Sequence, residues 1–165
     1  KDSNQTLPTY LNKLYQEFGY YNNSLFIIEL PGTYGQQIIK EIMSDLHAIQ
    51  PKTLDNMPVL HVQDRLSKKD KLPDNYQVGH YLDMISLYLS KDLKTRITIR
   101  PSGTEPVLKI YIQCHDRVKN DLSSTKNTVD AKTGLLKASI ANYIESRLSQ
   151  QSRKEWNKSR HQVLS

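Results

Sequence analysis

One stretch decides the fold: residues 98–111 read TIRPSGTEPVLKIY. Apolar and polar residues alternate over 96–100 and again over 107–114, and the residues between these runs are turn formers. A period of two is typical of a strand with one buried and one exposed face. Because so short a link joins neighbouring antiparallel strands, the stretch predicts two paired strands that meet at a tight loop.

Further elements are expected on both sides of this hairpin. Apolar runs bounded by turn residues predict strands over 24–30, 58–62 and 84–89. Apolar residues at helical spacing predict helices over 6–19, 36–47 and 135–148. Residues 51–56, 67–75 and 116–133 are polar and are expected to be loops, the last of them mobile. The order strand, helix, four strands, helix predicts the α+β class, with helices on one face of an antiparallel sheet.

The length of 165 residues suits one domain with flanking pieces. We expect the domain over 22–150 and a basic polar tail that frays over 151–165. Residues 1–21 carry the first predicted helix, whose apolar stripe has to pack on something. The stripe covers either the domain that follows or a domain that precedes it.

Composition narrows the setting of the protein. No apolar run approaches the roughly 20 residues that cross a bilayer, so we expect a soluble protein without a membrane partner. The single cysteine, Cys114, excludes a disulfide or a Cys-rich zinc site within the chain and indicates a reducing, cytoplasmic compartment. Residues 115–165 hold ten basic and five acidic residues, which accounts for most of the net charge of +6.

The loop at 100–106 has the chemistry of an anion site. The planar guanidinium of Arg100 can contact two phosphate oxygens, and Ser102 and Thr104 add hydroxyl donors. Gly103 lets backbone N–H groups approach a ligand closely, and the flanking prolines limit the entropy lost on ordering. Composition by itself favours an ordinary hairpin turn over a phosphate site, because Pro, Ser and Gly are the residues that turns use.

Two charged neighbours are expected to support the loop. Glu105 would repel a phosphate unless it points away or pairs with a cation, so we interpret it as an orienting residue. Lys109 alternates outward on the following strand and is either an auxiliary cation or a solvated side chain.

The motif RPSGTEP at 100–106, followed by the apolar strand, resembles the phosphate-binding loop in the last domain of the α-D-phosphohexomutases, the phosphoglucomutase and phosphomannomutase family. Residues 33–43 resemble the helix that opens that domain, and 11–21 resemble the helix and Gly-Tyr-Tyr ending of the domain before it. The resemblance implies a TATA-binding-protein-like domain and assigns residues 1–21 to the preceding mutase domain. The polar segment 116–133 departs from the compact family pattern as an insertion would.

The resemblance also implies a parent enzyme that interconverts hexose 1-phosphate and hexose 6-phosphate, an intramolecular phosphotransferase of the isomerase class in carbohydrate metabolism. Its phosphoserine and its Mg²⁺ ligands would lie on other mutase domains, because this chain has no serine loop, Asp-rich metal loop or sugar-recognition loop of the family types. The chain would hold the phosphate that is not transferred, of a hexose phosphate or bisphosphate, through Arg100, Ser102, Gly103 and Thr104. As a fragment it is expected to be inactive, with neither catalytic residues nor a metal or other cofactor of its own.

Other candidate groups receive no role from the sequence. The five histidines, His47, His61, His80, His115 and His161, show no metal-ligand spacing, and nothing brings Asp64, Asp70, Asp83 and Asp92 together in pairs. Cys114 is expected to be a packing residue.

A different class of function remains open: a basic module for nucleic acid or another acidic partner. It would depend on Arg147, Arg153, Lys154, Lys158 and Arg160. Because these residues lack interleaved aromatics for base stacking, nucleic acid is the less favoured partner. The sequence does not distinguish glucose, mannose, pentose and bisphosphate substrates, and it leaves the oligomeric state and the source open.

Overall fold

The computed structural model describes residues 6–66 and 83–163, without the side chains of 159–163. The predicted loop over 67–75 and His80 lie outside the described residues. Five strands form one antiparallel sheet in the order β1-β7-β6-β5-β4. The strands are β1 (Tyr20–Glu29), β4 (His61–Asp64), β5 (Ile85–Tyr88), β6 (Arg96–Pro101) and β7 (Val107–Asp116). A small hairpin of β2 (Thr53–Leu54) and β3 (Met57–Pro58) stands beside them.

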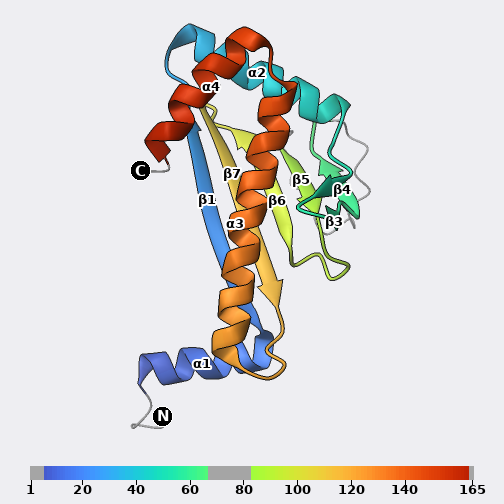
Figure 1. The fold of residues 1–165 in the computed structure, drawn as a ribbon, viewed down its shortest axis with the longest axis vertical. Helices are drawn as coiled ribbons and strands as arrows, with labels where there is room; N and C mark the ends of the chain where they lie inside the picture. Colours follow the sequence, from blue (N-terminus) through green and yellow to red (C-terminus); the bar gives the residue numbers. More distant parts are fainter. Residues whose placement is uncertain (1–5, 67–82, 164–165) are drawn as a thin grey trace.

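Helices cover one face of this sheet (Figure 1). The helix α3 (Leu122–Arg147) runs along β1 and β7, while α2 (Gly32–Ala48) and α4 (Gln150–Val163) pack near one end. The order β1, α2, β4 to β7, α3 confirms the predicted α+β arrangement of strand, helix, four strands, helix. The hairpin at β2 and β3 replaces the loop expected over 51–56.

The core lies between the helices and the covered face of the sheet. Alternate residues of the central strands point into it and are fully buried, as in Ile97 and Ile99 of β6 and Leu108, Ile110 and Ile112 of β7. Their neighbours in sequence point to the opposite, open face. The alternation in the sequence therefore decides which side chains face the helices and which remain accessible.

The first strand is longer than predicted. The strand predicted over 24–30 starts four residues earlier, because β1 begins at Tyr20 and pairs with β7 from the Tyr20–Asp116 position onward. Tyr20 and Asn22 both donate to Asp130 of α3, over 3.1 and 2.6 Å. Partners on β7 and α3 thus supply the hydrogen bonds that these polar residues would otherwise form with water.

The prediction of a mobile loop over 116–133 is wrong beyond Asp121. Asp121 caps α3 by accepting from the N–H of Ser124 over 2.6 Å, and the helix then continues for 26 residues. Its first half buries only Val129 and Thr133, so the sequence there has too few apolar residues to display a helical stripe. Packing across β1 and β7 orders this half.

The expectation of fraying beyond residue 150 is also wrong. The tail forms α4, in which Trp156 is fully buried in the core. Glu41 of α2 accepts from the Ser149 N–H over 3.0 Å and from the Ser152 hydroxyl over 2.7 Å. Arg153 donates to the carbonyl oxygen of Leu148 and to others at the end of α3. The long-range bonds from Glu41 and the local bonds from Arg153 together hold a segment whose own hydropathy is low.

The first helix, α1 (Leu7–Phe18), has no buried residue. It begins as predicted at Thr6, whose side chain accepts from the Thr9 N–H, and ends at Gly19 with a φ of 89°. Leu7 and Phe18 are 79 % and 57 % exposed. The assignment of residues 1–21 to a preceding domain, and of 22–150 to the domain itself, stays a prediction, and the structure adds that the boundary at 21 falls inside β1.

Candidate anion-binding site

The predicted loop lies between the ends of β6 and β7, and backbone bonds fix its stem. The Ser102 N–H donates to the Val107 carbonyl oxygen over 2.8 Å, and the Val107 N–H donates to that of Glu105 over 2.8 Å. The first residue after β1 joins the stem, because the Leu30 N–H donates to the Pro106 carbonyl oxygen over 2.9 Å. Three strand ends therefore hold the loop in place.

The tip of the loop is open to solvent. Ser102 is half-buried, while Gly103 and Thr104 are exposed. A Cβ atom added at Gly103 would meet no heavy atom within 4 Å, and its φ is not in the left-handed region. The fold itself thus does not require glycine here, and the open space above Gly103 is available to a ligand.

Arg100 is positioned by an aromatic neighbour. It lies on the open face near the end of β6, and its Nη2 donates to the Tyr111 hydroxyl of β7 over 3.2 Å. The guanidinium carbon lies 5.6 Å from the centre of the Tyr111 ring. Both contacts restrict the long side chain without neutralising its charge, so the charge remains available to an anion.

Lys109 and Glu105 differ in their relation to the loop. Lys109 pairs with Arg100 across the ladder, so the two cations occupy adjacent positions on the open face. Glu105 is exposed, and the described residues show no ion pair between Glu105 and Lys109. The structure leaves Glu105 pointing to solvent, which is the other arrangement that the sequence allowed.

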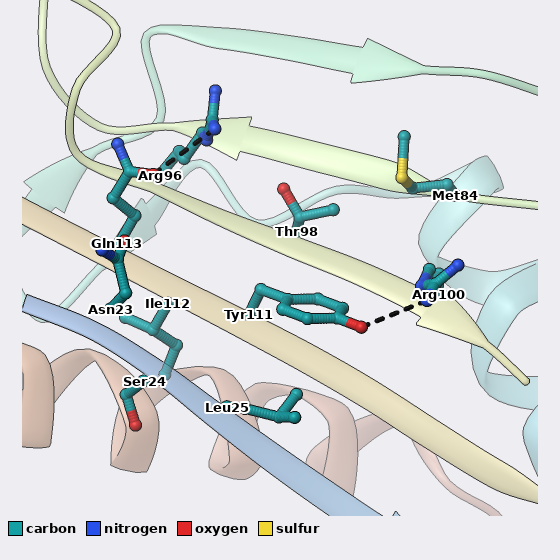
Figure 2. A pocket seen from close by; sticks show the side chains of 10 residues that line it. All are labelled: Asn23, Ser24, Leu25, Met84, Arg96, Thr98, Arg100, Tyr111, Ile112 and Gln113. Carbon is teal, nitrogen blue, oxygen red and sulfur yellow. Dashed lines mark hydrogen bonds between the residues drawn. The ribbon is translucent and has the colours of Figure 1, made fainter.

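A shallow pocket of about 430 Å³ extends from Arg100 across the open face (Figure 2). Arg96 lies at its other end, where its Nη2 donates to the Gln113 side-chain oxygen over 3.4 Å. Thr98 and Tyr111 lie between the two arginines, and Leu25 of β1 and Met84 add apolar surface. The lining includes two guanidinium groups and no carboxylate, so its electrostatics favour an anion.

The loop and the strands around it are similar to part of a known protein family. Residues 75–122, which include β5, β6, the loop and β7, match the model of the phosphoglucomutase/phosphomannomutase C-terminal domain. A phosphoglucomutase of Staphylococcus aureus (strain MSSA476) is 26 % identical over 129 residues, which cover 76 % of this chain and 23 % of the relative. A phosphoglucomutase of Staphylococcus haemolyticus is 30 % identical over 117 residues, or 68 % of this chain and 21 % of the relative.

The chain contains a C-terminal domain of the phosphohexomutase family. It spans less than a quarter of the length of these curated relatives. Among solved structures, the open form of the phosphoglucomutase pp63/parafusin from Paramecium is similar with a TM-score of 0.41 and 15 % identity, over 83 % of this chain and 24 % of that one. A score of this size describes a distant likeness of shape and says nothing about function.

The phosphohexomutase domain offers no visible metal centre in its described part. No three His, Cys, Asp or Glu side chains of residues 6–66 and 83–163 gather so as to hold a metal ion. Burial raises the pKa of the Cys114 thiol, which keeps it protonated and suits a packing residue. Among the described helices, none is both long and apolar enough to cross a membrane.

Arg147, Arg153 and Lys158, near the end of this phosphohexomutase domain, each contact other residues of the chain. Arg147 forms a two-pronged ion pair with Asp45 of α2, and Arg153 donates to carbonyl oxygens at the end of α3. Lys158 pairs with Glu155 over 2.7 Å. The structure therefore does not gather these cations into one free patch, while Arg160 lies among the side chains that are not described.

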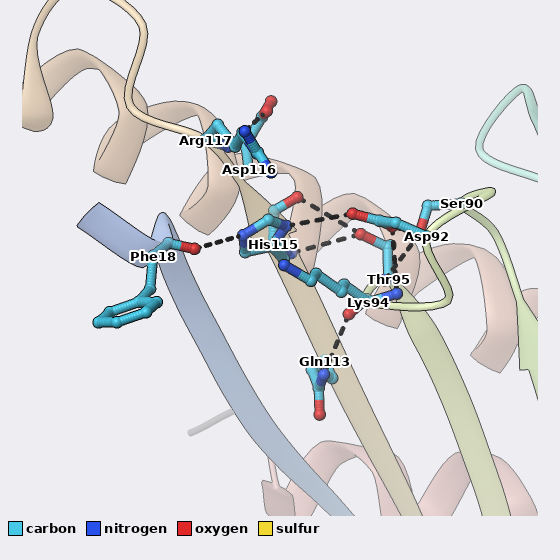
Figure 3. Close-up of polar contacts among 9 residues, drawn as sticks. All are labelled: Phe18, Ser90, Asp92, Lys94, Thr95, Gln113, His115, Asp116 and Arg117. Carbon is cyan, nitrogen blue, oxygen red and sulfur yellow. Dashed lines mark hydrogen bonds and ion pairs between the residues drawn. The ribbon is translucent and has the colours of Figure 1, made fainter. Parts of the chain in front are cut away.

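The sequence missed two polar clusters in the phosphohexomutase domain. His47 lies 2.9 Å from Asp64 and 2.8 Å from Asp83. His115 donates from Nε2 to the Phe18 carbonyl oxygen over 3.1 Å, and its Nδ1 lies 3.7 Å from Asp92 (Figure 3). Each cluster joins segments far apart in sequence, so no spacing rule could have found it.

Proposed function

We propose that this domain clamps the non-transferred phosphate of a hexose phosphate in a phosphohexomutase. The parent enzyme would interconvert hexose 1-phosphate and 6-phosphate, with its reacting serine and Mg²⁺ ligands on other mutase domains that are the partners of this one. The observation that carries the proposal is Arg100, a cation held by a neutral tyrosine beside an exposed loop of hydroxyl and backbone donors.

The chemistry of the loop suits a phosphate dianion. Arg100 supplies charge, and Ser102 and Thr104 supply hydroxyl groups for which the described residues show no side-chain hydrogen bond. Charge-assisted hydrogen bonds contribute about 1.5–3 kcal/mol each. Lys109 beside Arg100 adds to the positive potential without a direct contact being needed.

Such a clamp contributes to catalysis without touching the reacting atoms. Binding energy from the remote phosphate holds the sugar in line with the nucleophile and offsets the entropy lost on ordering. A loop fixed at three strand ends needs little rearrangement on binding, which keeps that contribution available. The domain by itself therefore binds and does not react.

The proposal is tested by NMR titration of the 165-residue chain with glucose 1-phosphate and mannose 6-phosphate. We expect amide shifts at Ser102 to Glu105 and a Kd near millimolar, since that corresponds to only about 4.1 kcal/mol. Arg100→Ala should raise the Kd about tenfold or more. Arg117→Ala is the matched control, because Arg117 is exposed and distant from the loop along β7.

Two results would contradict the clamp. One is equal binding by the Arg100→Ala and Arg117→Ala variants. The other is a spectrum that a short DNA duplex perturbs and sugar phosphates leave unchanged, which would favour the basic module instead. Removal of Arg153 or Lys158 would then identify the residues involved.

A further inference from the structure

The junction between β1 and α2 contacts the stem of the loop at 100–106. β1 ends at Glu29, which pairs with Val107, the first residue of β7. The next residue, Leu30, donates its N–H to the Pro106 carbonyl oxygen over 2.9 Å. The Leu30 side chain is 2 % exposed and belongs to the core. One residue therefore connects the loop to the core of the domain.

The carbonyl group of the same Leu30 lies directly against the first turn of α2. The helix begins at Gly32, whose φ of 84° turns the chain back toward Leu30. Gly35 is buried there, and a Cβ atom added to it would lie 1.6 Å from the Leu30 oxygen and 2.4 Å from its carbonyl carbon. Because a Cβ atom closer than 3.0 Å to another heavy atom forces something to shift, only glycine fits at position 35.

Both sides of this contact resist movement. Pro31 restricts the peptide that follows Leu30, and the Leu30 side chain cannot move deeper into a close-packed core. On the other side, α2 is held by its buried apolar stripe, which consists of Ile38, Ile39, Ile42, Met43 and Leu46. A methyl group added at position 35 therefore pushes Leu30 away from α2, and the bond from Leu30 to Pro106 moves with it.

We propose that Gly35 is a positioning residue for the loop at 100–106. Its lack of a side chain lets α2 hold Leu30 where the Leu30 N–H fixes Pro106. The inference rests on the proposed function of the loop. Gly35 contacts no anion itself, so its loss removes no donor from the site. Its loss frees the loop before binding, and a loop that has to be ordered by its ligand binds more weakly.

The test combines amide hydrogen exchange with titration of the ¹⁵N-labelled 165-residue chain by glucose 1-phosphate. Gly35→Ala should raise the exchange rate of the Leu30 amide about tenfold and the Kd about three- to tenfold. Gly134→Ala on α3 is the matched control, because a Cβ added there meets nothing within 4 Å. Gly19→Ala strains the opposite end of the pairing between β1 and β7 and should leave the Kd unchanged, which separates positioning from a general loss of stability.

A second variant disturbs the same junction more mildly. A Cβ added at Gly32 meets no heavy atom within 4 Å, but its φ of 84° disfavours alanine. Gly32→Ala should shift the Leu30 exchange rate and the Kd in the same directions as Gly35→Ala, by about two- to threefold. Thermal melting checks that each variant is folded, and Gly32→Ala carries the test if Gly35→Ala does not fold.

The outcomes separate this inference from the clamp. If the folded variants leave the Kd unchanged, with or without faster exchange at Leu30, the positioning role is refuted and the clamp stands. If Gly19→Ala weakens binding as much as Gly35→Ala, the effect belongs to stability and the positioning role is again refuted. If the unsubstituted chain binds no glucose 1-phosphate, the clamp is refuted, and the exchange rate of Leu30 alone decides whether Gly35 holds the stem.

Discussion

The two faces of the sheet differ in how completely the fold uses their side chains. On the covered face, residues such as Ile99, Leu108 and Ile110 are fully buried under α2, α3 and α4. On the open face, the same strands present Arg96 and Arg100, which are held by neutral neighbours and not neutralised. One face accounts for stability, and the other keeps charge that the fold itself does not need.

The largest effect on stability is expected from Trp156→Ala on the covered face. Trp156 is fully buried where α4 closes the core over β1, and removing its indole leaves a cavity. We expect the free energy of unfolding to fall by about 3–5 kcal/mol. Urea unfolding measures it, and Lys154→Ala on the exposed side of α4 is the control. A loss below 1 kcal/mol would mean that α4 is not part of the core.

A smaller loss is expected from Gly19→Ala, where α1 meets the sheet. Gly19 has a φ of 89°, and an added Cβ would lie 2.4 Å from the His115 ring and 2.6 Å from the Asp116 carbonyl oxygen. A left-handed alanine and this contact should cost about 1–3 kcal/mol. Thermal melting measures the loss, with Gly134→Ala, where the added Cβ meets nothing within 4 Å, as the control. A Gly19→Ala variant that melts at the same temperature as the unsubstituted chain would contradict the contact.

The free energy of unfolding should depend on pH through His47, which lies near β4. Burial lowers the pKa of His47, but hydrogen bonds with Asp83 and Asp64 and their charges outweigh it, so the pKa is raised above its usual value. A raised folded-state pKa means that the stabilisation is present below the unfolded pKa of about 6.5 and is lost as the pH rises through the folded value. Urea unfolding across this range should show the decline, and His47→Gln should remove it. An unchanged slope in His47→Gln would assign the decline to another group.

The smallest effect on stability is expected from Tyr111→Phe on the open face. The substitution removes the hydroxyl that accepts from Arg100 and keeps the ring beneath it. We expect unfolding to change by no more than about 0.5 kcal/mol, because the site lies on the open face away from the core. Sugar-phosphate binding should weaken a few-fold, which NMR titration measures against Tyr10→Phe on exposed α1. A loss of stability with unchanged binding would make Tyr111 a structural residue only.

The sequence predicted the elements that depend on contacts between residues close together along the chain, and it missed those that depend on distant residues. The strands around the loop follow from the alternation of residues such as Ile97 and Ile110 with polar neighbours, and β6 and β7 lie where expected. The sequence did not predict the first half of α3 or any of α4. These helices are stabilised by single buried side chains such as Val129 and Trp156, and by the hydrogen bonds from Ser149 and Ser152 to Glu41. Those anchors give no periodic signal.

The candidate site divides in the same way. The loop motif at 100–106 is contiguous, so the sequence alone indicated an anion site and its residues, which await a binding measurement. Arg96 and Gln113 were not singled out, because strand pairing across a hairpin brings them together. The same holds for His47 and His115, whose acidic partners come from other elements.

The sequence by itself determined the class of the fold, the central strands and the family motif, because each of these is written in local spacing or in adjacent residues. Only the tertiary structure decided that the polar segment and the tail are helices, and that two arginines share one open face beside neutral partners. The physical reason is that burial and strand pairing join residues far apart along the chain, and their free energy outweighs the weak local preferences of the polar segments.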